Sequence, residues 1–258
     1  MGPCSKLARA CVCLVAALGA GRAAAGSATV AVAANFVPPL AELEKAFEQR
    51  GEHTLTIVSG STGQLYTQVL NGAPFDVFLS ADAEHVDMLV RAKLADGATR
   101  FTYAVGKLAL FTRDTGKLAP LTLDTLRRTD YRWLAIGNPA LAPYGLAAEQ
   151  TLRKLGLWDG VQPRLVRGEN IAQTFAMAET RNADLAFVSL SQTIAYTGTA
   201  ASFVVPPELY DPIRQDAVLL ARGSGNAAAR AFLTFLTGAD AAAAIERFGY
   251  AARGAASR

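Results

Sequence analysis

The chain has 258 residues, of which 51% are hydrophobic, so it is long enough for one large or two modest domains and too apolar to be disordered. Its formal net charge is +3 at pH 7. Lys6, Arg9 and Arg22 account for these three charges, and no acidic residue lies near them, so the chain after residue 25 carries no net charge. This balance argues against a nucleic-acid or membrane-surface role, which would require a basic stripe there.

The first 25 residues have the pattern of a cleaved secretory signal. A basic start is followed by the apolar run Cys11–Ala20 and by small residues that end at Ala25. About ten apolar residues are too few to span a bilayer, which argues against an N-terminal membrane anchor. All the cysteines lie in this segment, and none follows the apolar run as a lipid-modified cysteine would: Cys4, Cys11 and Cys13. We therefore expect cleavage after residue 25 and a soluble, periplasmic protein without disulfides.

Short apolar runs alternate with stretches of helical periodicity along the rest of the chain. The runs are rich in β-branched or aromatic residues and predict strands at 29–33, 54–59, 75–80, 107–112, 133–137, 164–166, 184–189, 203–205 and 217–220. Helices are predicted between them, at 39–50, 62–70, 84–91, 146–155, 171–180, 227–236 and 239–248. The alternation predicts an α/β protein whose sheets are mainly parallel and carry helices on both faces.

Two segments could carry the chain between domains, residues 97–106 and the proline-containing residues 202–215. If the chain crosses at both, residues 27–106 and 216–258 form domain I and residues 107–215 form domain II. Two such domains would leave a cleft between them, which is a common place for a ligand.

Four predicted junctions between a strand and the following helix carry small or polar residues. In the sequence SGSTGQLYTQ, Ser61 and Thr62 stand between two glycines at a helix start. Unpaired N–H groups and the helix dipole make such a start suitable for an anion, but the lysine of a nucleotide-binding loop is missing. Ser61 alone is also explained as an ordinary helix cap. The other junctions are Ala33–Phe36, Asn138–Gly145 and Gly168–Ile171.

Ligands of open α/β sheets gather beyond the carboxyl ends of the strands, so these junctions could converge on one point. The groups available there are nearly all neutral donors. A site of donors alone suits a small, fully deprotonated dianion, whereas hydrogen phosphate would need a carboxylate to accept its proton. The nearest acid, Glu169, is expected to face solvent. The donors are Asn35, Ser61, Thr62, Tyr144 and the backbone amides near Tyr144 and Ile171.

No group of residues predicts an enzyme. His53 and His85 stand outside the junctions, and neither has a second histidine or cysteine at the spacing of metal ligands. Asp82 is expected to cap the helix that follows it rather than to form an acid pair with Asp76. A hydrolase or transferase built on Asp76 or Glu169 is therefore disfavoured. We predict no catalytic residue, no metal-ligating side chain and no cofactor.

Four segments resemble the periplasmic molybdate-binding proteins that feed ABC importers. They are GSTGQL, NGAPFDVFLSAD, GNPALAPYGLAAE and the run from RGENIAQTFAMAE to DLAFVS. The likeness covers nearly the whole chain after residue 25. It implies a type II periplasmic binding fold of two domains, with the ligand in the cleft between them. The protein would close like a hinge on molybdate or tungstate and deliver it, as a monomer, to a permease in the inner membrane.

The resemblance also implies which residues hold the oxyanion through its oxygens. Asn35 occupies the position of the first donor, and Thr62, with Ser61 beside it, occupies the position of a binding serine. Tyr144 contributes from the proline-rich junction, and Ile171 contributes its backbone amide.

One position departs from the pattern. Some members have a tyrosine that binds the ligand where this chain has Ser189, whose side chain is too short to reach as far. Tyr144 stands where those members have a small residue. We therefore expect Tyr144 to supply the missing hydroxyl from the opposite side.

Two other functions stay open. Another tetrahedral oxyanion, sulfate or phosphate, could bind to the same fold, and sulfate differs from molybdate only in size, because it is also a dianion with four acceptor oxygens. The sensing half of a transcription regulator shares the fold, but it would need a DNA-binding helix pair where the signal stands.

Overall fold

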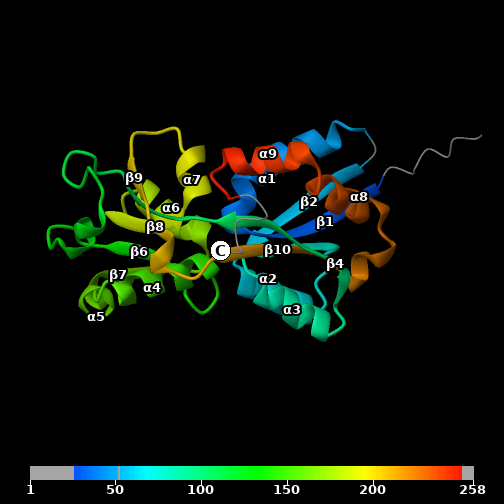
Figure 1. Ribbon diagram of the computed structural model, residues 1–258, viewed down its shortest axis with the longest axis horizontal. Helices are drawn as coiled ribbons and strands as arrows, with labels where there is room; N and C mark the ends of the chain where they lie inside the picture. The colour runs from blue at the N-terminus through cyan, green and yellow to red at the C-terminus, as the bar shows by residue number, and fades with distance from the viewer. Residues whose placement is uncertain (1–25, 52, 252–258) are drawn as a thin grey trace, which may run out of the picture.

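The computed structural model describes residues 26–51 and 53–251, so the predicted signal at residues 1–25 lies outside the described residues (Figure 1). The chain forms two lobes, and each lobe is a five-stranded sheet flanked by helices. This architecture confirms the predicted α/β fold class.

The sheet of the first lobe has the strand order β2-β1-β3-β10-β4. Strand β10 is antiparallel to both of its neighbours, and the other four strands share one direction. Its strands are β1 (Gly26–Ala33), β2 (His53–Gly60), β3 (Val77–Leu79), β4 (Ala95–Gly106) and β10 (Ile213–Leu220). Its helices are α1 (Val37–Glu48), α2 (Thr62–Leu70), α3 (Glu84–Arg91), α8 (Ala227–Leu236) and α9 (Ala239–Arg247).

The sheet of the second lobe has the order β7-β6-β8-β5-β9, and here β5 is the reversed strand. Its strands are β5 (Leu108–Thr112), β6 (Leu134–Gly137), β7 (Leu165–Gly168), β8 (Leu185–Ser189) and β9 (Ala201–Val204). Its helices are α4 (Pro143–Lys154), α5 (Trp158–Val161), α6 (Ile171–Glu179) and α7 (Leu190–Ala195). Short 3-10 helices lie at Ala34–Phe36, Leu123–Arg127, Gln162–Arg164, Pro207–Leu209 and Ala221–Gly225.

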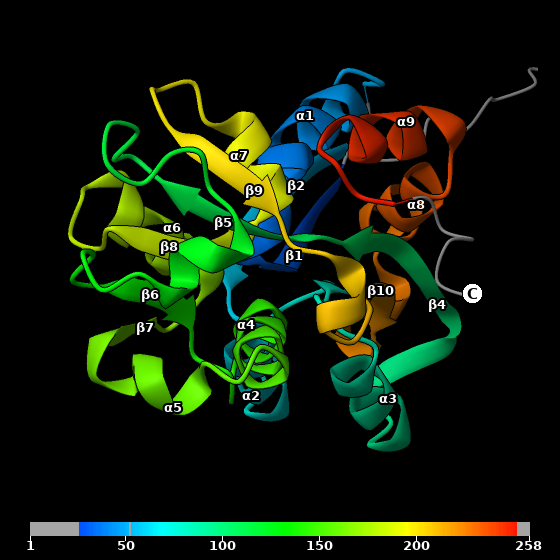
Figure 2. The ribbon, with the colours of Figure 1, turned by 60° about the vertical axis from the view of Figure 1, so that its left-hand side comes forward.

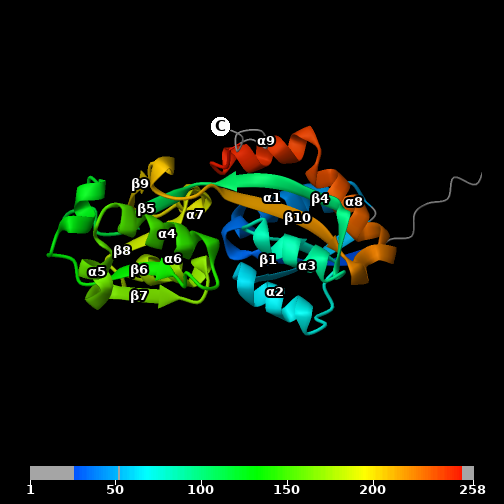
Figure 3. The ribbon, with the colours of Figure 1, turned by 60° about the horizontal axis from the view of Figure 1, so that its bottom comes forward.

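The segment 97–106, predicted as a linker, is instead part of the twelve-residue strand β4. Phe101, Tyr103 and Val105 alternate with small or polar residues, but glycines on both sides obscured this period of two. Strands β4 and β10 pair over most of their length and run together toward the second lobe (Figure 3). The chain therefore passes between the lobes just after β4 and again just before β10. The domain limits at 106 and 216 stay a prediction.

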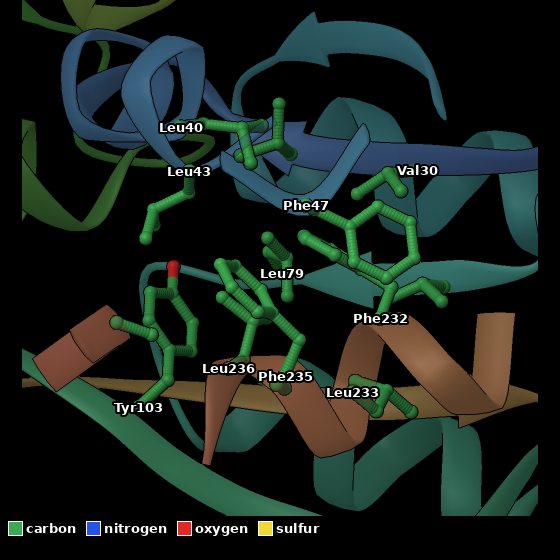
Figure 4. Close-up of a cluster of buried hydrophobic side chains, with 14 of the residues drawn as sticks. Val30, Leu40, Leu43, Phe47, Leu79, Tyr103, Phe232, Leu233, Phe235 and Leu236 are labelled. Atoms are coloured by element: carbon green, nitrogen blue, oxygen red, sulfur yellow. The ribbon is translucent and has the colours of Figure 1, made fainter. Parts of the chain in front are cut away.

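A cluster of apolar side chains fills the space between the first sheet and the helices α1, α8 and α9 (Figure 4). Phe232 is fully buried there, with its ring centroid 5.4 Å from that of Phe47 and 6.4 Å from that of Phe235. Among residues 26–51 and 53–251, no single helix is long and apolar enough to cross a membrane. Helices α8 and α9 pass that test only as a pair bent by 65°, and both pack into this cluster.

We predict that Phe232→Ala lowers the free energy of unfolding by about 3–5 kcal/mol, because it removes a ring from a close-packed core and leaves a cavity. Urea unfolding followed by circular dichroism measures the change. Leu70→Ala is the matched control, since Leu70 is 47% exposed and should cost less than about 0.5 kcal/mol. Equal losses in the two variants would contradict the assignment of this cluster as the core.

Candidate anion-binding site

A small cavity lies between the two lobes. It is too small for a drug-sized organic ligand. The first lobe lines it with Ala33, Ala34, Asn35, Gly60, Ser61, Thr62 and Ala81, and the second lobe lines it with Ala142, Pro143, Tyr144 and Ile171. The structure thus brings together all five residues that the sequence predicted, although they come from four separate junctions along the chain.

The register of the parallel strands explains why these residues converge. Strands β1 and β2 end level with each other, because Ala33 pairs with Gly60. Strands β6 and β7 do the same in the second lobe, where Gly137 pairs with Gly168. Each lobe therefore presents two strand ends side by side, each followed by a helix start, and the two pairs face each other across the cavity.

The lobes touch directly beside the cavity. The Gly63 N–H, in the first turn of α2, donates to the Leu141 carbonyl of the second lobe at 3.0 Å. A Cβ added to Gly63 would lie 3.3 Å from both the Cα and the carbonyl oxygen of Leu141, so only glycine allows this approach without a shift. On another side, the Ser191 hydroxyl donates to the Asn35 carbonyl at 2.7 Å, where α7 lies close to α1 (Figure 2).

Ser61 and Thr62 are buried, and the oxygen of each hydroxyl already accepts an N–H of the protein. Ser61 Oγ accepts from the Gln64 amide at 3.3 Å as the cap of α2, which confirms the capping role. Thr62 Oγ1 accepts from the Ala81 amide at 3.0 Å. A hydroxyl has one hydrogen, so each of these hydroxyls keeps its hydrogen for a ligand in the cavity.

Tyr144 is arranged in the same way. Its side chain is 2% exposed, and its oxygen accepts from Gln215 Nε2 at 3.1 Å. Burial is the largest of the causes that raise the pKa of Tyr144 well above the ordinary value of 10.0. The phenol therefore stays neutral at physiological pH and keeps its hydrogen.

The side chain of Asn35 is turned toward the protein. Its Nδ2 donates to Gln215 Oε1 at 2.9 Å and to the Tyr250 hydroxyl at 3.0 Å, which occupies both amide hydrogens. The main-chain N–H of Asn35 lies at the start of the helical segment Ala34–Phe36, where N–H groups have no partner within the helix.

Ile171 is the first residue of α6, so its N–H also belongs to a helix start. The Asn170 side chain caps the amide of Gln173, and Gln192 Nε2 holds the Ile171 carbonyl at 3.0 Å. Ser189 is buried but is not among the residues that line the cavity. Its hydroxyl instead contacts Gln192 Oε1 at 3.0 Å, so it supports the glutamine that positions Ile171.

Four supporting residues escaped the sequence reasoning: Tyr103, Gln192, Gln215 and Tyr250. Tyr103, Gln215 and Tyr250 lie away from the strand-to-helix junctions that follow parallel strands, whereas Gln192 lies in the first turn of α7, directly after the parallel strand β8. Two signals were available: the polar Gln215 at the start of the apolar run that forms β10, and the capping pair of Ser189 and Gln192 at the start of α7.

None of the residues described as lining the cavity is charged. Glu169 is exposed, as predicted, and accepts from Gln64 Nε2 at 3.4 Å. His53 Nδ1 accepts from the Gly26 amide, and His85 pairs with Asp82, so neither histidine reaches the cavity. Asp82 stands one residue before the N-cap of α3, Ala83, and accepts from the His85 amide in the first turn at 2.9 Å, so it caps the helix as predicted, though from outside the N-cap position. Within residues 26–51 and 53–251, no group of three or more His, Cys, Asp or Glu residues could hold a metal ion.

Comparison with known proteins places the chain in a family. The model of the bacterial extracellular solute-binding proteins matches residues 28–251. A molybdate-binding protein ModA of Rhodobacter capsulatus is 44% identical over 88% of this chain and 89% of its own length. The ModA of Azotobacter vinelandii is 43% identical over 92% of this chain and 96% of its own length. The chain belongs to the ModA family.

A solved structure agrees with this assignment. The periplasmic molybdate-binding protein of Azotobacter vinelandii superimposes with a TM-score of 0.82 and 36% identity, over 87% of this chain and 98% of that one. A match of this extent includes both lobes.

We predict that the tyrosines around the cavity resist ionisation. Burial raises the pKa of Tyr250 to about 12 and those of Tyr103 and Tyr144 well above 10.0. Since the unfolded chain loses the Tyr250 proton near the ordinary value, the contribution of Tyr250 to stability is complete below pH 10.0 and is lost as pH rises through about 12.

An ultraviolet titration of tyrosine ionisation checks this expectation. Tyr250→Phe should leave the signal below about pH 11 almost unchanged, because an unionised phenol contributes nothing to it. Loss of the signal of one full tyrosine in that range would contradict the burial of this hydroxyl.

Proposed function

We propose that this chain is the solute-binding component of an ABC import system and that it binds molybdate, and also tungstate, in the cavity between its lobes. The observation that carries the proposal is the donor-only lining: Ser61, Thr62 and Tyr144 each have an oxygen occupied by an N–H and a hydrogen left over. The main-chain N–H groups of Asn35 and Ile171 add donors from helix starts. Membership of the ModA family supports molybdate as the ion.

The protonation state of the anion follows from this lining. Molybdate, tungstate and sulfate are dianions whose oxygens all accept hydrogen bonds, so a cavity of donors satisfies each of them. Phosphate carries at least one proton near neutral pH, and no carboxylate among the described lining residues could accept it. Bound phosphate would leave the hydrogen of its own hydroxyl group without an acceptor, and this cost disfavours phosphate.

Sulfate is the alternative that charge does not exclude. It is the smaller tetrahedron, so donors placed for molybdate would lie too far from some of its oxygens. The relationship to molybdate-binding proteins favours the larger ion.

The chain's role in transport follows from the same proposal. We infer that it is exported to the periplasm after its signal is cleaved, acts as a monomer and passes the anion to a permease in the inner membrane. It has no enzymatic step to perform, because binding and release of an unchanged anion complete its task. Asn35, Ser61, Thr62, Tyr144 and Ile171 would bind the anion oxygens, with no side chain on the metal itself.

Closure of the lobes would make the site complete. Ser61 and Thr62 come from the first lobe, and Tyr144 and Ile171 come from the second. An anion bound between them gains contacts to both lobes only when they are together, so it shifts the population toward the closed form. The bond from Gly63 to Leu141 stabilises the same form.

We predict that parallel calorimetric titrations of the protein without residues 1–25 show binding of molybdate and tungstate, weaker binding of sulfate and no binding of phosphate. Tyr144→Phe should weaken molybdate binding by about 1.5–3 kcal/mol, because it removes one hydrogen bond to a charged ligand. Tyr196→Phe, the same change outside the cavity, should have no effect. Tight binding of sulfate, together with no binding of molybdate, would show that sulfate is the ion instead.

We predict that Gly63→Val weakens molybdate binding by about 1–3 kcal/mol, because its side chain would hold Leu141 and the second lobe away. Gly225→Val is the control, since a Cβ there meets no atom within 4 Å. Small-angle scattering should show that molybdate compacts the wild-type protein more than the Gly63 variant. Equal radii of gyration with and without molybdate in the wild type would rule out closure on the ligand.

A further inference from the structure

Gln215 lies outside the lining of the cavity, yet it joins three of the groups around it. It is fully buried on β10, the strand that returns from the second lobe to the first. Its Oε1 accepts from Asn35 Nδ2 at 2.9 Å and from the Tyr103 hydroxyl at 3.0 Å. Its Nε2 donates to the Tyr144 hydroxyl at 3.1 Å, so one side chain of the first lobe reaches a binding residue of the second.

The backbone around Gln215 is shaped for this arrangement. The register of β10 against β4 shifts between Gln215, which pairs with Ala104, and Asp216, which pairs with Thr102. Such a bulge re-aims the side chains near it, and here it leaves Tyr103 directed at the amide of Gln215. Gly106 ends β4, and a Cβ added there would collide with the Tyr144 hydroxyl and lie 2.7 Å from Gln215 Nε2.

The donor and acceptor roles of the amide decide where the hydrogen of Tyr144 goes. Asn35 Nδ2 directs a hydrogen at Gln215, and the Tyr103 hydroxyl shares its hydrogen between Gln215 and the Ser80 carbonyl at 3.1 Å, so the oxygen of Gln215 is held on their side and its NH₂ group faces Tyr144. The Tyr144 oxygen is then an acceptor for Gln215, and the O–H bond of Tyr144 has to point in another direction. With the amide reversed, Gln215 would accept that hydrogen and remove it from the cavity.

We propose that Gln215 is a positioning residue for anion binding: it orients the hydroxyl of Tyr144 so that this hydroxyl donates into the cavity. The inference rests on the proposed function, since it concerns how the same site holds its anion. The Tyr250 hydroxyl is the competing acceptor for this hydrogen, since burial raises the pKa of Tyr250 and an interaction with Tyr144 partly opposes that rise. A dianion in the cavity is a stronger acceptor than the neutral Tyr250 hydroxyl, because hydrogen bonds to charged acceptors are about twice as strong as neutral ones.

A double-mutant cycle for molybdate binding tests the proposal. Gln215→Met keeps the size of the side chain and removes the N–H donor. Tyr144→Phe removes the hydroxyl on which that donor acts. We expect each single variant to weaken molybdate binding by about 10- to 100-fold, and the double variant to be within about threefold of Tyr144→Phe, because the two changes remove the same interaction.

Gln192→Met is the matched control. Gln192 is also a buried glutamine near the cavity, but it holds the Ile171 carbonyl and has no bond to Tyr144. Its effect should add to that of Tyr144→Phe. The thermal unfolding midpoint of every variant is measured alongside, and Gln215→Asn, which withdraws the N–H by one methylene, replaces Gln215→Met if the latter fails to fold.

The possible results distinguish a failure of this proposal from a failure of the proposed function. Wild-type protein that binds molybdate, with coupled losses for Gln215 and additive losses for Gln192, supports the positioning role. Wild-type binding with additive losses for Gln215 and Tyr144 would overturn the positioning role and leave the proposed function intact. Wild-type protein that binds no tetrahedral dianion would overturn both.

Discussion

The single hydrogen of a hydroxyl group is the constraint on which the site depends. Ser61, Thr62 and Tyr144 each accept an N–H from the protein, and the three donors come from three different parts of the chain. Because each oxygen already accepts one hydrogen bond, the hydrogen of each hydroxyl is available to donate to a ligand. In the proposed function, hydrogen bonds made outside the cavity would make it an anion site without a lysine or arginine among the described lining residues.

The same contacts tie ligand binding to the relative position of the lobes. The Gly63 amide, the Ser191 hydroxyl and the Gln215 amide each bridge from one lobe to the other beside the cavity. Uncompensated donors in a buried cavity cost free energy, and an anion that accepts their hydrogen bonds removes this cost. In the proposed function, closure and binding would therefore stabilise each other, without any long-range attraction from a positively charged surface.

The parts of the site that could be predicted are those that depend on local sequence. A strand followed by a glycine, a small hydroxyl residue and a helix marks a helix start, and the ends of parallel strands gather at one edge of a sheet. The supporting network could not be predicted in this way. Asn35 and Gln215 are 180 positions apart, and their contact depends on β10 returning to the first sheet. Strand β4, which carries Tyr103, was itself missed because glycines flank its alternating pattern.

Proton exchange on binding tests the central claim most directly. Calorimetry of molybdate binding in buffers of different ionisation enthalpy measures how many protons enter or leave the complex. A cavity of neutral donors around a bare dianion predicts no exchange near neutral pH, because Tyr144 stays protonated and no described lining residue titrates there. Uptake or release of a large fraction of a proton would contradict the account, since it would require an ionisable group or a protonated anion in the site.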